Sequence, residues 1–160
     1  MPVTESLHTS RLSLTPLDLA DAAEMVVVLA DPDLYTYTGG APPTLAQLDE
    51  QYRYQTADAP HEGEIWHNWI LRHNGTAIGF VQATVKDDSA DLAWVVGVPW
   101  QGSGFATEAS HAVKDWLADH GTRRFSAHIH PDHRASGAIA TRLGLRPTGH
   151  LDDDGEMIWN

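Results

Sequence analysis

The sequence predicts an α+β domain in which helices pack on a mostly antiparallel central sheet. Three observations support this fold class. The chain has 160 residues, the size of one ordinary domain, and 42% of them are hydrophobic. Strand-like and helix-like segments follow one another without a repeat or a linker. Asn74-Gly75 joins two strand-like runs and is the strongest short signal for a hairpin. We therefore expect one domain over residues 1–160, with about seven strands and four helices.

The first third of the chain predicts one strand and two helices. Residues 11–14 alternate polar and apolar side chains, as strands do. Residues 18–30 predict a helix that Asp18 can cap and Pro32 ends. After a loop rich in glycine and proline, residues 44–47 have the form of a capping box. They open a helix that runs to about residue 54.

The middle of the chain predicts three consecutive strands, over residues 64–72, 76–85 and 91–98. Tight turns at residues 74–75 and 86–89 make each successive pair antiparallel. The third strand is almost wholly apolar, which indicates burial on both of its faces.

The last third of the chain alternates helices and strands. Residues 106–120 and 135–143 predict helices, each ended by a glycine. Residues 124–130 predict a strand between them, and a final hairpin turns at residues 152–155. This order of elements completes the predicted sheet.

The net charge of −12, from 22 acidic and 10 basic residues, argues against two classes of partner. The basic residues form no cluster, so we expect neither nucleic-acid binding nor attachment to an anionic membrane. The chain has no cysteine, which excludes disulfides, cysteine-ligated metals and a cysteine nucleophile. Residues 1–10 lack the apolar core of a signal peptide, and the longest apolar run, residues 25–30, is too short to span a bilayer. We therefore expect a cytoplasmic protein.

A glycine-rich loop between a strand and a helix is the strongest candidate for a binding site. Gly102 and Gly104 can adopt positive φ and let a ligand approach the backbone. The amides of residues 101–106, aided by the dipole of the following helix, can converge on an anion. The loop lacks the Gly-Lys-Ser/Thr of a nucleoside triphosphate site, and Thr107 stands where a dinucleotide fingerprint needs Gly or Ala. Taken alone, the loop is equally compatible with anion binding and with a plain turn that binds nothing.

The pattern of this loop is Val96-(four residues)-Gln101-Gly102-Ser103-Gly104-Phe105-Ala106, which resembles the acyl-CoA pyrophosphate loop of the GNAT superfamily of N-acetyltransferases. Three further segments resemble the branch with the ribosomal-protein N-acetyltransferases: residues 106–109, residues 9–17, and residues 135–136 with 143–145. Together these motifs cover nearly the whole chain. The resemblance implies a GNAT-like fold in which two neighbouring strands splay apart at the acyl-CoA site.

The resemblance also implies acetyl-CoA as co-substrate. The backbone of residues 94–98 is expected to pair with the pantetheine arm, and the amides of residues 101–106 to hold the pyrophosphate. An amide near Val96 is expected to polarise the thioester carbonyl. The residues implied in acetyl-CoA binding are Trp94, Val95, Val96, Val98, Gln101, Gly102, Ser103, Gly104, Phe105, Ala106, Thr107, His133 and Ser136.

Two residues near the last predicted helix are the candidates for catalysis. The resemblance makes Ser136 the partner of the thiol, and the alternative is that it only caps or packs this helix. Many relatives use a tyrosine there instead, but all four tyrosines of this chain lie in its first third. His133 stands where the family usually has an asparagine that contacts the CoA arm. It can still donate one hydrogen bond, or act as a proton donor itself.

The base that takes the proton of the amine is left open. The candidates are His128 and His130, which share one strand face, and His67, Asn68, Glu62, Glu64 and Glu108. A base acting through water is the alternative to all of them. Tyr35 and Tyr37 are expected to border the acceptor pocket.

A second motif suggests a different chemistry. Residues 128–133 spell His-x-His-x-Asp-His, which resembles the zinc signature of metallo-β-lactamase-fold hydrolases. That fold needs further ligands well downstream, and only His150 follows here. We therefore expect no metal. An acyl-CoA-binding regulator without turnover is a further alternative, which observed catalysis would exclude.

The sequence thus predicts an N-acetyltransferase that moves an acetyl group from acetyl-CoA to a primary amine, by direct attack in a ternary complex. The acceptor is open among a protein N-terminus, an amino acid, a polyamine and an amine antibiotic. The net charge of −12 favours a cationic acceptor. A homodimer is compatible with the family resemblance.

Overall fold

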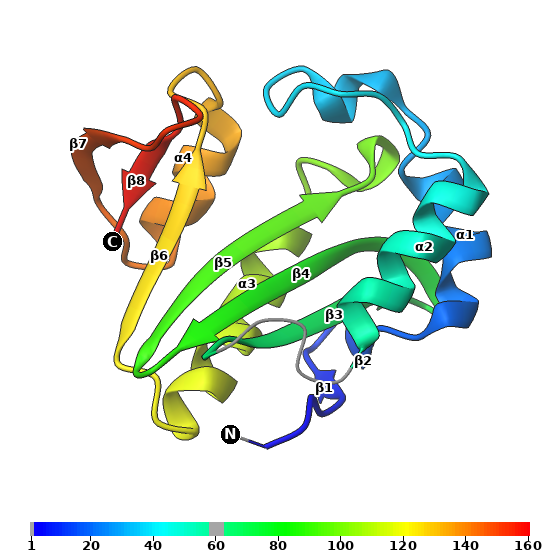
Figure 1. The fold of residues 1–160 in the computed structure, drawn as a ribbon, viewed down its shortest axis with the longest axis horizontal. Coiled ribbons are helices and arrows are strands. Elements are labelled where there is room, and N and C mark those ends of the chain that lie inside the picture. Colours follow the sequence, from blue (N-terminus) through cyan, green and yellow to red (C-terminus); the bar gives the residue numbers. More distant parts are fainter. Residues whose placement is uncertain (1, 58–62) are drawn as a thin grey trace.

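One twisted sheet of eight strands carries the fold of the computed structural model, which describes residues 2–57 and 63–160 (Figure 1). The order across the sheet is β1-β2-β3-β4-β5-β6-β8-β7. Every neighbouring pair is antiparallel except β5 and β6, which run parallel. The predicted α+β fold with a mostly antiparallel sheet is confirmed.

The strands are β1 (Leu7–His8), β2 (Ser13–Pro16), β3 (Ile65–His73), β4 (Thr76–Lys86), β5 (Ser89–Val96), β6 (Arg124–Ile129), β7 (Pro147–Leu151) and β8 (Met157–Trp159). The helices are α1 (Ala22–Val28), α2 (Leu45–Thr56), α3 (Phe105–Asp119) and α4 (Arg134–Arg142). Short 3-10 turns lie at Leu19–Asp21, Pro32–Tyr35 and Val98–Trp100. No helix in the described ranges is both long enough and apolar enough to cross a membrane.

The structure has one strand more than the predicted seven, and its first helix is shorter than predicted. β1 has only two residues, too few to leave a periodic pattern in the sequence. The predicted first helix begins as a 3-10 turn, which Asp18 caps in a capping box, and α1 follows it. The capping box predicted at Thr44 and Gln47 opens α2 as expected.

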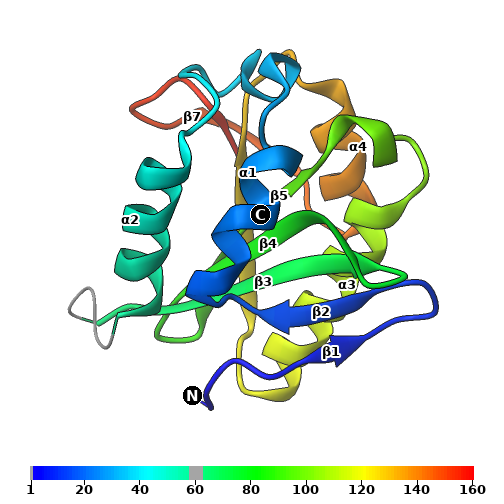
Figure 2. The same cartoon turned by 90° about the vertical axis from the view of Figure 1, so that its right-hand side faces the viewer.

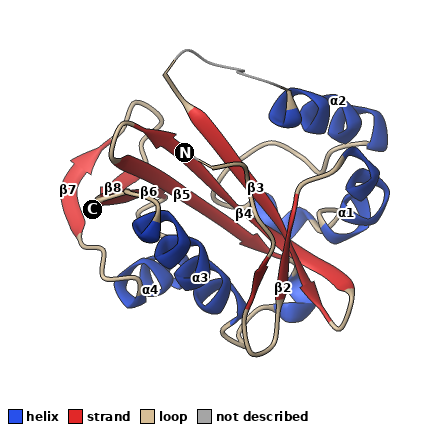
Figure 3. Cartoon of the chain, turned by 90° about the horizontal axis from the view of Figure 1, so that it is seen from below, coloured by secondary structure: helices blue, strands red, loops and turns tan. Residues whose placement is uncertain are grey.

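Helices cover both faces of the sheet (Figures 2 and 3). The short helices α1 and α2 lie on one face, and α3 and α4 lie on the other. The core beneath α3 includes Leu14, Trp69 and Val81, whereas the core beneath α1 and α2 includes Ile70. A third cluster around Ala127 joins α4 to β6. We refer below to the α1–α2 face and the α3–α4 face of the sheet.

A histidine lies in the core beneath α3. His67 is 1% exposed and packs against the rings of Trp69 and Trp116. Its Nδ1 lies 2.8 Å from Thr4 Oγ1, and its Nε2 has no partner among the described residues. Burial lowers the pKa of His67 from 6.5 to about 4. His67 is therefore neutral in the folded protein at neutral pH.

We expect the buried His67 to make the protein less stable in mild acid. Between pH 6.5 and about 4 the unfolded chain binds a proton at this position that the folded chain does not. The free energy of unfolding therefore falls as the pH drops through this window, by up to roughly 3 kcal/mol. Urea unfolding at several pH values measures this slope.

The variant His67→Phe keeps an aromatic ring between the tryptophans and removes the titration. Its free energy of unfolding should depend less steeply on pH than that of the wild type between pH 6.5 and 4. The matched control is His150→Phe, which changes an exposed histidine and should leave the slope unaltered. An equal slope in all three proteins would show that His67 does not resist protonation.

Candidate functional site

The parallel strands β5 and β6 separate after three residue pairs. The last opposed pair is Asp91 and Ser126. Beyond it the two strands diverge, as green β5 and yellow β6 show in Figure 1. We call this point the fork. The splay that the sequence predicted is therefore present, and β5 lacks a partner strand on its β6 side from residue 92 onward.

The backbone of β5 beyond the fork points hydrogen-bonding groups away from β4. Gly97 N–H donates to the carbonyl of Ile78 on β4, at 2.7 Å. Because successive residues of a strand point their backbone groups to opposite sides, Trp94 and Val96 point theirs toward the β6 side. The carbonyl of Val96 accepts a hydrogen bond from Gln101 Nε2 at 2.9 Å. The backbone amide of Val96 therefore faces the side from which β6 has separated.

Two expectations about β5 are wrong. The strand ends at Val96, and Val98 lies in a 3-10 turn, because Gly97 and Pro99 bend the chain there. Val98 therefore cannot extend the strand along a pantetheine arm. The predicted burial on both faces also fails, since Ala93 is exposed and Trp94 is half-buried. The reason is the fork, which removes the neighbouring strand from this part of β5.

The glycine-rich loop opens α3 in the predicted manner. Gly102 and Gly104 have φ values of 79° and 82°, in the left-handed region that favours glycine. Gly104 is the N-cap of α3, and no side chain caps that end of the helix. The first amides of this 15-residue helix are thus left without a side-chain acceptor, which is the arrangement that binds an anion.

Arg11 fastens this loop to the N-terminal hairpin, which sequence analysis did not predict. Its Nη1 donates to the carbonyl of Ser103 at 2.9 Å, and its Nε donates to Glu108 Oε1 at 2.8 Å. The guanidinium also lies over the ring of Phe105, 4.3 Å from its centre. Arg11 and Glu108 both lie in segments on which the family resemblance rests. The sequence therefore marked these two residues, but it did not show that they bind each other.

Glu108 is held by three donors and is not a base. Thr9 Oγ1 and the backbone N–H of Arg11 donate to its Oε2, in addition to the ion pair. Burial alone would raise the pKa of Glu108, but the hydrogen bonds from Thr9 and Arg11 outweigh it and lower the pKa. Its carboxylate keeps the loop and α3 in register with the hairpin.

His133 and Ser136 lie together at the start of α4. His133 is the N-cap, and its Nδ1 accepts a hydrogen bond from the Ser136 N–H at 3.2 Å. His133 Nε2 lies 3.3 Å from Ser136 Oγ. The histidine, not the serine, therefore caps the helix. Burial lowers the pKa of His133, so its imidazole is neutral.

This geometry fixes the tautomer of His133. Because Nδ1 accepts a hydrogen bond, the single proton of the neutral ring is on Nε2. Nε2–H then donates to Ser136 Oγ, and the hydroxyl hydrogen of Ser136 is left free for another acceptor. The pair can thus present one O–H donor at the head of α4.

His128 bridges two carboxylates next to the fork. It lies on β6 two residues beyond Ser126, on the same face of the sheet as Asp91. Its Nδ1 lies 2.7 Å from Asp152 Oδ2, and its Nε2 lies 3.5 Å from Asp91 Oδ1. Burial alone would lower the pKa of His128, but the bond to Asp152 and the charges of Asp91 and Asp152 outweigh it and raise the pKa. Asp91 and Asp152 were not predicted as site residues.

Three aromatic rings lie close together, at tilted angles, beyond the end of β6. The ring of Tyr37, from the loop before α2, lies 4.4 Å from that of His133 and 5.4 Å from that of His130. The loop therefore reaches across to the start of α4, as Figure 1 shows. Tyr35 instead donates its hydroxyl to the carbonyl of Leu29, which fixes the base of the same loop.

Of the remaining candidates for the base, those that the structure describes lie in different parts of the fold. His67 is buried on the α3–α4 face and cannot meet an acceptor on the other side of the sheet. Glu64 accepts a hydrogen bond from Trp66 Nε1, at 3.1 Å. Asn68 lies beneath α2, in a cavity described below. Glu62 lies outside the described residues.

The side chains of the His-x-His-x-Asp-His string do not converge. His128 binds Asp152, His133 caps α4, and His130 Nδ1 accepts a hydrogen bond from the N–H of Asp132. Within residues 2–57 and 63–160, no three histidine, aspartate or glutamate side chains gather closely enough to hold a metal ion.

Comparisons with known proteins agree with this geometry. A curated relative, the uncharacterized N-acetyltransferase p20 of Bacillus licheniformis, is 25% identical over 154 residues, covering 93% of this chain and 86% of the relative. The solved acetyltransferase of Agrobacterium tumefaciens str. C58 is 26% identical, with a TM-score of 0.75 over 99% of this chain and 95% of that one.

A second similar structure belongs to the branch that the sequence resembles. It is RimL, a ribosomal L7/L12 α-N-protein acetyltransferase, in complex with coenzyme A. It has a TM-score of 0.81 and covers 97% of this chain and 95% of RimL, but its 15% identity shows the fold alone. The family model described as the acetyltransferase (GNAT) domain matches residues 11–146, from Arg11 through α4 to the residue before β7. The chain combines a splayed pair of parallel strands with a glycine-rich helix start, and the acetyltransferase (GNAT) model matches most of its length. The chain therefore belongs to the GNAT family.

Proposed function

We propose that this acetyltransferase transfers the acetyl group of acetyl-CoA to a primary amine by direct attack in a ternary complex. The observation that carries the proposal is the fork, which leads directly into the uncapped start of α3. Unpaired backbone groups of β5 suit an extended arm with amide groups, and the free amides of the loop suit a pyrophosphate. The structure of RimL with coenzyme A supports this occupant.

The loop residues have distinct tasks in this proposal. Gly102 and Gly104 let the backbone turn toward the phosphates, and Gln101 holds the end of β5 through the Val96 carbonyl. Arg11 holds the Ser103 carbonyl, and so keeps the loop open for the phosphates. The Val96 amide donates to the thioester carbonyl as negative charge develops on its oxygen.

Attack forms a bond from the amine nitrogen to the acetyl carbon, and the carbon–sulfur bond then breaks. We place Ser136 at the leaving sulfur, where its free O–H donates a hydrogen bond to the thiolate. His133 holds that hydroxyl through Nε2–H and needs no change of charge. Stabilising a thiolate by a hydrogen bond is enough, because a thiol ionises near pH 8.5.

We propose His128 as the base that takes the proton of the amine. When its Nδ1–H donates to Asp152, the lone pair of Nε2 points toward Asp91 and the fork. An ammonium group that approaches Nε2 and Asp91 together meets one proton acceptor and one negative charge, which suits a cationic acceptor. His130 lies two residues further along the chain, but its ring contacts that of Tyr37.

We also propose a cytoplasmic location, because a chain without cysteine needs no oxidising compartment. Dimerisation is compatible with the fold, and the molecular mass in solution decides it. The regulator and the zinc hydrolase are not favoured, because the family and the diverging histidines both support acetyl transfer.

Acetyl-CoA should raise the thermal midpoint of the wild-type protein. At about 100 times its Kd the ligand adds roughly 2.7 kcal/mol, which is a shift of several degrees. Gly104→Trp should abolish the shift, because the indole fills the loop. The matched control is Gly121→Trp, at another positive φ with open space around it, and it should keep the shift. A full shift in the Gly104 variant would remove the loop from the binding site.

Ser136→Ala should lower kcat by roughly tenfold to a hundredfold, as loss of a donor to a developing anion does. The KM for acetyl-CoA should change little, because the contact strengthens only as the thiolate forms. Thr141→Ala is the control, on the same helix and bonded only to the backbone of Gly137. Equal kcat values for both variants would leave Ser136 with a packing role.

The pH dependence of kcat should carry the mark of His128. The rate should rise with pH as His128 loses its proton, and His128→Gln should remove this limb and slow the reaction about a hundredfold. Asp152→Asn removes a charge that raises the pKa of His128, so the limb should move to lower pH. His150→Gln is the control, and a limb unchanged in the Asp152 and His128 variants would exclude His128.

A further inference from the structure

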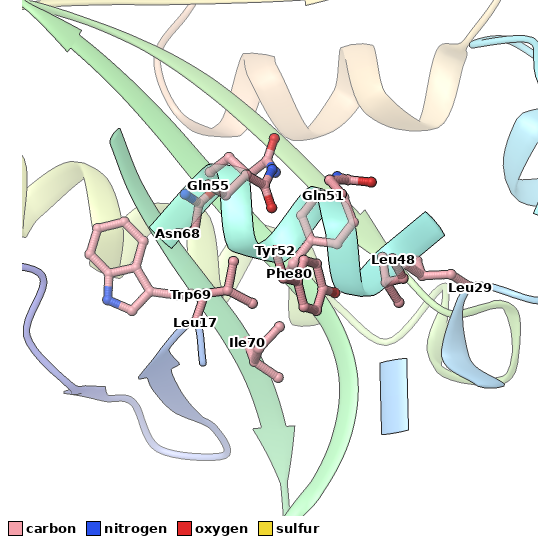
Figure 4. A pocket seen from close by; sticks show the side chains of 11 residues that line it. Leu17, Leu29, Leu48, Gln51, Tyr52, Gln55, Asn68, Trp69, Ile70 and Phe80 are labelled. Carbon is pink, nitrogen blue, oxygen red and sulfur yellow. The ribbon is translucent and has the colours of Figure 1, made fainter. Parts of the chain in front are cut away.

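A narrow cavity lies on the α1–α2 face, between α2 and strands β3 and β4 (Figure 4). Four carboxamide side chains line it: Gln51 and Gln55 from α2, Asn68 from β3 and Gln82 from β4. Its other walls are apolar or aromatic, such as Ile70 and Phe80. Among residues 2–57 and 63–160, no Lys, Arg, Asp, Glu or His side chain lines it. Gln51 is exposed and the other three are half-buried, and the Oε1 atom of Gln55 is fully buried, where a polar atom without a partner is costly.

These carboxamides have no hydrogen-bond partners within the described chain. None of the four side chains donates or accepts a hydrogen bond there, and the Oε1 atom of Gln55 is fully buried and unpartnered. A buried carbonyl oxygen without a donor is energetically unfavourable. An acceptor that brings N–H groups into this cavity would recover that cost.

The amides form a row that ends beside the fork. Asn68 on β3 is directly opposite Gln82 on β4, and Gln82 is directly opposite Ala93 on β5. Directly opposed residues share a face, so all three lie on the α1–α2 face. Ala93 is exposed and lies two residues beyond Asp91, where β6 has already left. The row therefore leads from the reacting end of the site to α2.

Charge is divided along this row. The end at the fork carries Asp91, Asp152 and His128, whereas none of the described residues that line the cavity has a charged side chain. A free amino acid would bring a carboxylate with no cation to bind it, and a polyamine would bring a cation with no anion. A neutral chain of hydrogen-bonding groups suits the carboxamides that line the cavity.

We infer that Gln82, Asn68 and Gln55 are specificity-determining residues that bind successive amide groups of an acceptor whose amine stands at the fork. This rests on the proposed acetyl transfer and narrows its acceptor to an amine carried on a neutral, extended chain of amides. Neighbouring strands lie about 4.8 Å apart, so Asn68 stands about 10 Å from Ala93. An extended chain advances about 3.3 Å per residue, so roughly three residues reach Asn68 and Gln55.

The test is a length series of acceptors with free amines: alanine, alanine amide, dialanine amide and trialanine amide, with putrescine as the diamine. For the wild type, kcat/KM should rise at least tenfold from alanine amide to trialanine amide. Alanine and putrescine should be used at least tenfold less well than trialanine amide. A flat series, or alanine or putrescine used as well as trialanine amide, overturns the inference.

The variants assign the amides to positions along the acceptor. Gln82→Leu should raise KM for every amide in the series, whereas Gln55→Leu and Asn68→Leu should raise it only for the longer ones. Glu50→Leu, on the exposed side of α2, is the matched control and should leave all values within twofold. Gln55→Leu with an unchanged KM for trialanine amide overturns the assignment, because the buried oxygen then has no role in binding.

The acetyl-CoA thermal shift separates this inference from the function on which it rests. Each Leu variant should keep the wild-type shift, which also shows that it is folded. A normal shift with no preference among acceptors, or with no acceptor acetylated, overturns the carboxamide row and leaves acetyl-CoA binding in place. A wild-type protein without the shift overturns both.

Discussion

The separation of β5 from β6 after Asp91 and Ser126 is the constraint on which the rest of the site depends. A sheet normally pairs every backbone group in its interior, and an unpaired group there is costly. Here the structure accepts unpaired groups on β5 and partly offsets them, since Gln101 takes the Val96 carbonyl. Gly79 allows β4 to lie close on the other side, where a Cβ would collide with the Val95 carbonyl oxygen. β5 is therefore fixed on one side and free on the other.

The two faces of the fork have different chemistry. Toward the α3–α4 face lie the amides of the α3 start and the neutral His133–Ser136 pair, which suit an anionic ligand and its leaving sulfur. Toward the α1–α2 face lie the carboxylates around His128 and the row of amides, which suit a cationic amine on a neutral chain. A net charge of −12 disfavours anionic ligands in general, so the backbone dipoles at the start of α3 are well suited to the phosphates of acetyl-CoA.

The sequence predicted the elements well where the signal is local. The Asn74-Gly75 hairpin, the cap at Asp18, the capping box at Thr44 and the glycine-rich start of α3 follow from short-range chemistry, and all are present. Contacts between distant segments could not be predicted in this way. The bonds of Arg11 to Ser103 and of His128 to Asp152 depend on how the sheet brings residues together, so the roles of Arg11 and Asp152 went unseen. The apolar run of β5 led to a wrong prediction of burial on both faces for the same reason. The separation of the neighbouring strand β6 leaves no mark in the residues of β5 itself.

The contacts of Arg11 with Ser103 and Glu108 have a consequence for the order of folding. Arg11 and the Ser103 carbonyl are 92 positions apart in the chain, and Thr9 and Glu108 are 99 apart. Contacts of such separation form late, because the entropy of closing a long loop must be overcome first. The helix start can therefore form early from local interactions, yet it is locked only when the first strands return to it. Competence to hold the nucleotide end of the co-substrate would then be among the last properties that the nascent enzyme acquires.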